Sequence, residues 1–172
     1  MVADPEKTTM FRSADGRFGV LLKAHVIKEV VRHCRASREA ETGGILVGHY
    51  SEDQAIAVVE QVTGPPPDSQ RCFAAFLRGI KGLQEMLNLL WIKPEKRYYL
   101  GEWHYHPLPV LAPSDVDVEQ MAKIAASEKY ACPEPILLII AGLKSTECRF
   151  SISVHPHNAT MIALAVTARM EA

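Results

Sequence analysis

The sequence predicts a mixed α/β domain in which a mixed β-sheet packs against helices. Helical and strand patterns alternate along the chain, yet several neighbouring strands are joined by turns too short for a crossover connection. The length of 172 residues fits one domain, which we expect over residues 16–172, after a flexible lead-in over residues 1–15. A chain of this length needs no metal to fold, so any metal it binds is expected to be functional.

The first half of the chain carries one predicted helix and three predicted strands. Apolar residues recur at helical spacing between residues 23 and 38, and charged residues occupy the opposite side. Two glycines, Gly43 and Gly44, then lead into an apolar run of strand length. In chain order we expect a strand over 17–22, a helix over 23–38, a strand over 41–50, a polar turn over 51–54 and a strand over 55–62.

The second half begins with a proline-rich surface loop over residues 64–70. Aromatic residues and alternation predict a strand over 98–106, and Ser114 is a predicted N-cap. The tail from 161 to 166 fits a strand or a helix. The other expected elements are a helix over 77–91, a loop over 107–113, a helix from 114 to about 129, and strands over 135–142 and 148–154.

The composition is that of an ordinary globular protein, with 48% hydrophobic and 23% charged residues. A net charge of -1 argues against broad electrostatic capture of nucleic acid. None of the four cysteines lies in a C-x-x-C pair, and no apolar run reaches membrane-spanning length. With no secretory signal in view, we expect a cytoplasmic protein with free thiols, no nucleic-acid partner and no membrane partner.

His104 and His106 are the most informative residues in the chain. Side chains two apart on a strand share a face, so the two imidazoles can converge on one ion from Cβ atoms about 7 Å apart. A catalytic zinc site needs three protein ligands and an open position. With Ser114 as N-cap, Asp117 lies in the first helical turn and is the candidate third ligand, which predicts one Zn²⁺ per chain.

Two further residues complete a hydrolytic site in this interpretation. Zinc brings the pKa of its water to about 7, and the reaction then needs a group that accepts the water proton and returns it to the leaving amine. Glu41 suits that role if its strand pairs beside the histidine strand, and Ser114 suits support of the oxyanion. Taken singly, H-x-H on a strand is more often chance, and S-x-x-D is more often a helix cap. The metal interpretation rests on the complete set in order.

This set resembles the signature of the JAMM, or MPN+, metallopeptidases, E-x(n)-H-x-H-x(7)-S-x-x-D. The chain matches it with Glu41, His104, His106, Ser114 and Asp117, and the glycine-rich run after Glu41 is also similar. The resemblance covers about residues 18–155. It implies a curved mixed sheet flanked by helices, a cytidine-deaminase-like fold. It also implies zinc-dependent hydrolysis of the bond after the C-terminus of a ubiquitin-like protein, with roles that agree with those above.

The compact length makes the chain similar to the prokaryotic JAB proteins. Such a resemblance implies a conjugated substrate with an extended C-terminal tail, either ubiquitin-like or a nucleotidyltransferase removed from its targets in CBASS antiphage systems. Alternatives are processing of a sulfur-carrier protein, and a non-catalytic MPN scaffold, against which the intact motif argues. A nucleobase deaminase is set aside because its P-C-x-x-C signature is missing. The oligomeric state stays open.

The loops over 64–71 and 107–113 are candidates to flank a channel for an extended tail, which strand addition would hold. Leu108, Val110 and Leu111 are apolar residues in the second loop. They are hypothetical substrate contacts, and packing on the domain's own core is an equal alternative. A second H-x-H at His155 and His157 is expected in an exposed loop. The role of Glu102 is left open.

Overall fold

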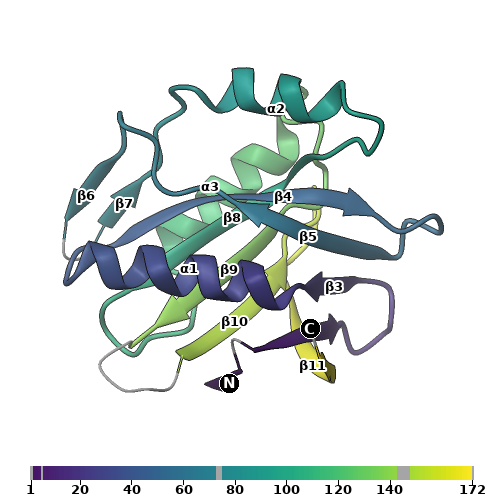
Figure 1. Cartoon of the computed structure of the whole chain (residues 1–172), viewed down its shortest axis with the longest axis horizontal. Helices are drawn as coiled ribbons and strands as arrows, with labels where there is room; N and C mark the ends of the chain where they lie inside the picture. The colour runs from purple at the N-terminus through teal and green to yellow at the C-terminus, as the bar shows by residue number, and fades with distance from the viewer. Residues whose placement is uncertain (1, 5, 73–74, 143–147, 172) are drawn as a thin grey trace.

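The computed structural model describes residues 2–4, 6–72, 75–142 and 148–171 (Figure 1). Three helices and eleven strands follow one another along the described chain. The elements are β1 Val2–Ala3, β2 Lys7–Arg12, β3 Gly19–Leu22, α1 Ala24–Ser37, β4 Thr42–Tyr50, β5 Ile56–Val62, β6 Gln70–Cys72, β7 Ala75–Leu77, α2 Leu83–Trp91, β8 Tyr98–His106, α3 Asp115–Ala126, β9 Ile136–Ala141, β10 Cys148–Val154 and β11 Ile162–Glu171.

The main sheet is mixed and strongly curved. Its strand order is β1-β10-β11-β2-β3-β5-β4-β8-β9, and β9 also pairs with β10, so the order closes into a ring. The pairs β3–β5 and β8–β9 are parallel, whereas the other pairs in this sheet are antiparallel. The predicted mixed α/β fold with a curved sheet is therefore confirmed.

The predicted flexible lead-in is wrong for the segment from residue 7 to residue 12. This segment forms β2, which pairs with β3 on one side and β11 on the other. Phe11 anchors it, since it is 1% exposed and its ring contacts the tilted ring of Phe150 in the core. The alternation in KTTMFR is too short to be distinguished from a polar tail without knowledge of its partner strands.

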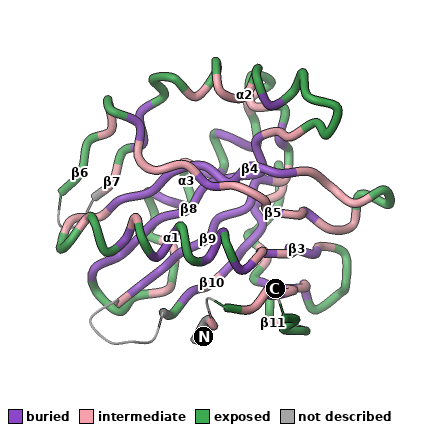
Figure 2. The backbone as a smooth tube through the Cα atoms, viewed as in Figure 1, coloured by how far each residue is buried: buried purple, intermediate pink, exposed green. Residues whose placement is uncertain are grey.

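Two apolar cores lie on opposite faces of β4, β8 and β9, which Figure 2 shows buried along most of their length. The helix α1 crosses the front of the sheet in Figure 1, and its apolar stripe joins the first core. Residues of α2 and α3 join the second core on the other face. On β8, Trp103 and Tyr105 face the first core, so the alternate positions face the second core and α3.

The antiparallel pair β4–β8 brings the start of β4 beside the end of β8, because Thr42 pairs with Tyr105 and Gly43 with His104. Glycine is required at position 43. A Cβ there would lie 2.4 Å from the carbonyl oxygen of Trp103 and 2.5 Å from the Phe76 ring. The glycine pair after Glu41 thus lets the neighbouring chain segments approach closely.

The region between β5 and β8 differs most from the prediction. The short strands β6 and β7 pair antiparallel as a hairpin that was not predicted, and α2 starts at Leu83 rather than at residue 77. Gly82 has a φ of +82° at the helix N-cap, and the Asp68 carboxylate accepts hydrogen bonds from the backbone N–H groups of Ile80 and Lys81. These contacts hold the segment before Leu83 in a turn.

The elements α3 and β11 also bear on the prediction. The helix α3 ends at Ala126, three residues before the predicted end, and the ambiguous tail is the strand β11. Within the described residues, none of the helices has both the length and the apolar character needed to cross a bilayer.

Candidate metal centre

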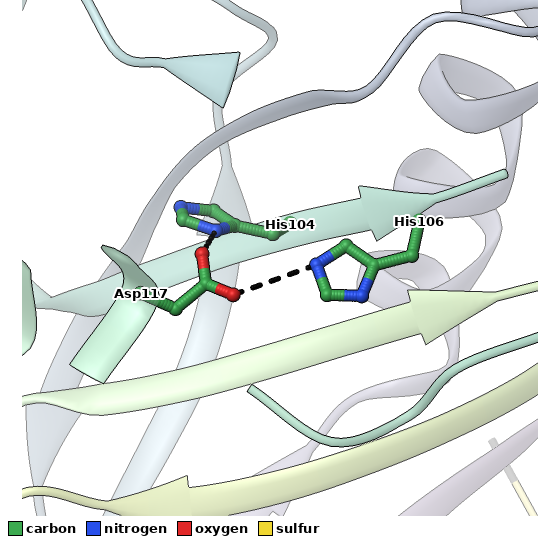
Figure 3. A group of neighbouring side chains, drawn as sticks. All are labelled: His104, His106 and Asp117. Carbon is green, nitrogen blue, oxygen red and sulfur yellow. Dashed lines mark hydrogen bonds and ion pairs between the residues drawn. The ribbon is translucent and has the colours of Figure 1, made fainter. Parts of the chain in front are cut away.

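His104, His106 and Asp117 come together at one point, as predicted. Both histidines project from the same face of β8, and Asp117 projects from the first turn of α3 (Figure 3). His104 Nδ1 lies 2.6 Å from Asp117 Oδ1, and His106 Nε2 lies 3.6 Å from Asp117 Oδ2. All three residues are buried, and one potential ligand atom from each lies within 4.8 Å of the others.

Ser114 fixes the position of Asp117. The Ser114 hydroxyl donates to Asp117 Oδ2 at 2.8 Å and accepts from the Asp117 backbone N–H at 3.2 Å, while the Ser114 N–H donates to Asp117 Oδ2 at 2.7 Å. This is a capping box, so the fold of the helix start and the placement of the carboxylate depend on the same two residues.

The charges of this group depend on one another. Burial opposes ionisation of Asp117, but its hydrogen bonds with His104 and His106 outweigh burial and hold its pKa well below the usual range. Burial likewise opposes protonation of His104, yet the hydrogen bonds with Asp117 and Glu102 raise its pKa to about 9. The pKa of His106 is also raised, against burial, chiefly by Asp117. The ionised Asp117 carboxylate therefore favours protonation of both neighbouring imidazoles.

Glu41, the residue just before β4, lies beside the candidate ligands. It lines a cavity of about 300 Å³ together with His106, Ser114 and Asp117. Burial raises the pKa of the Glu41 carboxyl, and the proximity of His106 partly offsets that rise. The cavity therefore brings together Glu41, Ser114 and two of the three candidate ligands, beside the position where the three ligands meet.

The three apolar residues of the 107–113 loop are not equivalent. Leu108 and Val110 are 53% and 51% exposed and line the cavity. Leu111 packs against the second core, and Ser151 Oγ donates to its carbonyl oxygen at 2.6 Å. Contact with a substrate stays a prediction for Leu108 and Val110, whereas Leu111 follows the core-packing alternative.

The second H-x-H lies apart from this group. His155 is buried, and its Nε2 lies 3.0 Å from Ser153 Oγ, so the expectation that it lies in an exposed loop is wrong. It follows β10 directly, and its backbone N–H donates to the Pro135 carbonyl oxygen at 3.0 Å. His157 is exposed, as expected.

Glu102 was left without a role by sequence reasoning. It is fully buried, its Oε2 lies 3.3 Å from His104 Nε2, and its Oε1 accepts a 2.7 Å hydrogen bond from Arg78 Nε. The sequence did contain a signal, since Glu102, His104 and His106 have the same parity on β8. Nothing in the sequence indicated Arg78, because it follows a hairpin that was not predicted.

The donor set fits a zinc ion. Two imidazole nitrogens and a carboxylate are the three-ligand set typical of catalytic zinc, and the adjoining cavity leaves room for a fourth position. The ring nitrogens directed away from the metal position already have partners. His104 Nε2 faces Glu102, and His106 Nδ1 lies 3.0 Å from the Val110 carbonyl oxygen. Such outer partners are a usual feature of metal-binding histidines.

Comparison with known families agrees with this geometry. The model of the family described as prokaryotic homologues of the JAB domain matches residues 23–153, which include all five motif residues. The chain belongs to the prokaryotic JAB family. This JAB domain is 35% identical over 158 residues to a "CD-NTase/cGAS isopeptidase" of Enterobacter hormaechei subsp. hoffmannii (strain UCI 50), covering 92% of the chain and 87% of the relative.

Two further proteins are similar to the JAB domain. A "CD-NTase/cGAS isopeptidase" of Escherichia coli (strain TW11681) is 27% identical over 125 residues, which cover 69% of the chain and 76% of that relative. The solution structure of protein DSY2949 from Desulfitobacterium hafniense matches with a TM-score of 0.56 and 18% identity, covering 83% of this chain and 86% of that one. The last likeness shows the fold alone. The family and the isopeptidase relatives together identify the JAB domain as a hydrolase of the deconjugating isopeptidase class.

Proposed function

We propose that this JAB domain is a zinc-dependent isopeptidase that releases a CD-NTase from the proteins to which its C-terminus is conjugated. The observation that carries the proposal is the convergence of His104, His106 and Asp117 beside a cavity that also contains Glu41. The substrate class is that named for the two isopeptidase relatives, one of which aligns over 92% of the chain.

His104 Nδ1, His106 Nε2 and an oxygen of Asp117 would hold the ion. A bound zinc ion supplies Lewis-acid chemistry, which makes water a competent nucleophile at neutral pH and polarises the scissile carbonyl. Everything else falls to the side chains and backbone of this chain. The raised pKa of Glu41 suits a group that accepts the proton of the attacking water and passes it to the leaving lysine amine.

Ser114 is the proposed oxyanion support. Its hydroxyl lines the cavity but donates to Asp117 in this structure, so the role requires the hydroxyl to rotate toward the substrate carbonyl. The exposed side chains of Leu108 and Val110 form an apolar wall of the cavity, where the C-terminal tail of the substrate would lie.

The test is cleavage of fusions in which a reporter protein follows the last residue of a CD-NTase, of ubiquitin or of a sulfur-carrier protein. We expect a single cut after the CD-NTase, abolished by Asp117→Ala and absent when the CD-NTase tail is deleted. Cleavage of the sulfur-carrier fusion alone would assign the other substrate class. If the zinc-loaded protein cut none of the three fusions, the proposed function would be contradicted.

A further inference from the structure

The two ring nitrogens of His104 have different acidic neighbours. Nδ1 faces Asp117 Oδ1 at 2.6 Å, on the side where the candidate ligands meet, whereas Nε2 faces Glu102 Oε2 at 3.3 Å (Figure 3 shows the first contact). Glu102 precedes His104 by two residues on β8, so both side chains project from one face of the strand. The nitrogen directed away from the metal position therefore has a carboxylate as its partner.

Glu102 is held in place by a buried network. Its other oxygen, Oε1, accepts hydrogen bonds from Arg78 Nε at 2.7 Å and from the Tyr99 hydroxyl at 3.4 Å. The guanidinium of Arg78 donates in turn to the Tyr130 hydroxyl at 2.8 Å and to the Gly79 carbonyl at 2.9 Å. With both oxygens engaged, the carboxylate has little freedom to turn away from His104.

The hairpin β6–β7 and the residue that follows it both contribute to this arrangement. Phe76 meets the His104 ring edge to face, with centroids 5.5 Å apart, and it occupies the space left free by the missing side chain of Gly43. Arg78, two residues later, reaches Glu102. The imidazole is thus constrained by the Phe76 ring on one side and by Glu102 at the nitrogen directed away from the metal position.

Stability alone is a weak reason for this ion pair. The side chains of Glu102 and Arg78 are 0% and 3% exposed, so both charges have been removed from water. The desolvation cost of such a pair is close to, or larger than, its attraction, and well-packed apolar residues of similar size are often as stable. A carboxylate that accepts from the outer nitrogen of a metal ligand has a direct functional use, because it fixes the tautomer and the ring orientation.

We propose that Glu102, held by Arg78, is a positioning residue that keeps the proton of His104 on Nε2 and presents Nδ1 to the metal. The inference rests on the proposed zinc site and deepens it. The other candidate histidine ligand has a weaker hydrogen-bond partner, since His106 Nδ1 faces only the backbone carbonyl oxygen of Val110 in the 107–113 loop. Glu102 therefore sets the affinity of the site for metal and takes no direct part in bond cleavage.

The experiment measures Zn²⁺ affinity by competition with a chromophoric chelator in Glu102→Gln and in the double variant Glu102→Leu/Arg78→Met. The ¹⁵N chemical shifts of His104 in the zinc-loaded protein report its tautomer. We expect 10- to 100-fold weaker binding in both variants, with a mixed or exchanging tautomer in Glu102→Gln. The double variant removes both buried charges, so it is expected to fold even if Glu102→Gln does not.

The matched control is Glu60→Gln. Glu60 on β5 is also a largely buried carboxylate with two cationic partners, Lys23 and Arg97, and it is not among the residues that line the metal cavity. This variant loses ion pairs and should retain wild-type zinc affinity. Zinc affinity within about twofold of wild type in Glu102→Gln or in the folded double variant would overturn the inference while leaving the zinc site intact. Failure of the wild-type protein to bind zinc would overturn both.

Discussion

Replacing Glu41 by Gln separates proton transfer from metal binding. The change keeps the size of the side chain and removes only its ability to carry a proton, and Glu41 is not among the three residues that meet at the metal position. General acid–base catalysis contributes about 10²- to 10⁴-fold, which corresponds to about 3–5 kcal/mol in the activation barrier. We therefore expect kcat for the CD-NTase fusion to fall by that factor, while zinc content is unchanged.

The same substitution has an expected effect on stability. Burial raises the pKa of the Glu41 carboxyl, so the folded state binds its proton more tightly than the unfolded state does. That difference lowers the free energy of unfolding once the pH exceeds the unfolded value, and the neutral Gln removes the penalty at pH 7. Metal-free Glu41→Gln should thus be at least as stable as wild type in urea titration. This is the trade-off expected of a functional residue.

The matched control is Glu39→Gln, which changes an exposed carboxylate two residues earlier in the chain. It should leave kcat, zinc content and stability unchanged. If Glu41→Gln binds zinc normally and retains more than about a tenth of wild-type kcat, Glu41 is not the proton carrier and the proposed chemistry is wrong.

Three other perturbations test separate parts of the structure. Gly43→Ala should lower the free energy of unfolding by about 1–3 kcal/mol in urea titration, because its Cβ would meet the carbonyl oxygen of Trp103; an unchanged midpoint would refute the close approach. Leu108→Asp should lower kcat/KM for the fusion and shift the free energy of unfolding by no more than about 0.5 kcal/mol. Leu111→Asp should instead lower the free energy of unfolding, because Leu111 packs against the second core. If the two variants had the same effects on cleavage and on stability, the distinction between these residues would be refuted. Burial lowers the pKa of His155 to about 4, so the unfolded state takes up a proton first as pH falls from about 6.5. Wild type should therefore lose up to about 3 kcal/mol more stability than His155→Gln between pH 6.5 and 4, and parallel pH profiles would contradict this origin.

The strands that carry the site could be predicted because their patterns are local. The strand β4 contains the apolar run Ile45–Val47 and β8 is rich in aromatic residues, and their bounds in the structure differ from the predicted ones by at most one residue. The placement of Ser114 and Asp117 could also be predicted from local sequence, because a capping box is formed by residues three apart. Local spacing was therefore sufficient to bring together the histidines and the carboxylate.

The parts that failed depend on distant partners. The strand β2 is identifiable only through its pairing with β3 and β11, at opposite ends of the chain. The hairpin β6–β7 has three-residue strands, and its neighbouring turn depends on hydrogen bonds to Asp68. Arg78 reaches Glu102 only because of that turn, so a sequence pattern gives the ligands but not the network that orients them.

The most direct test of the account is the zinc content of the purified protein after loading and removal of excess metal, measured by elemental analysis in wild type, Asp117→Ala and Asp115→Ala. Asp115 is an exposed carboxylate in the same helical turn and serves as the control. The account predicts about one zinc per chain in wild type and Asp115→Ala, as a three-ligand site requires, and almost none in Asp117→Ala. Wild-type protein that retains no zinc, or Asp117→Ala that retains as much as wild type, would contradict the assignment of the site.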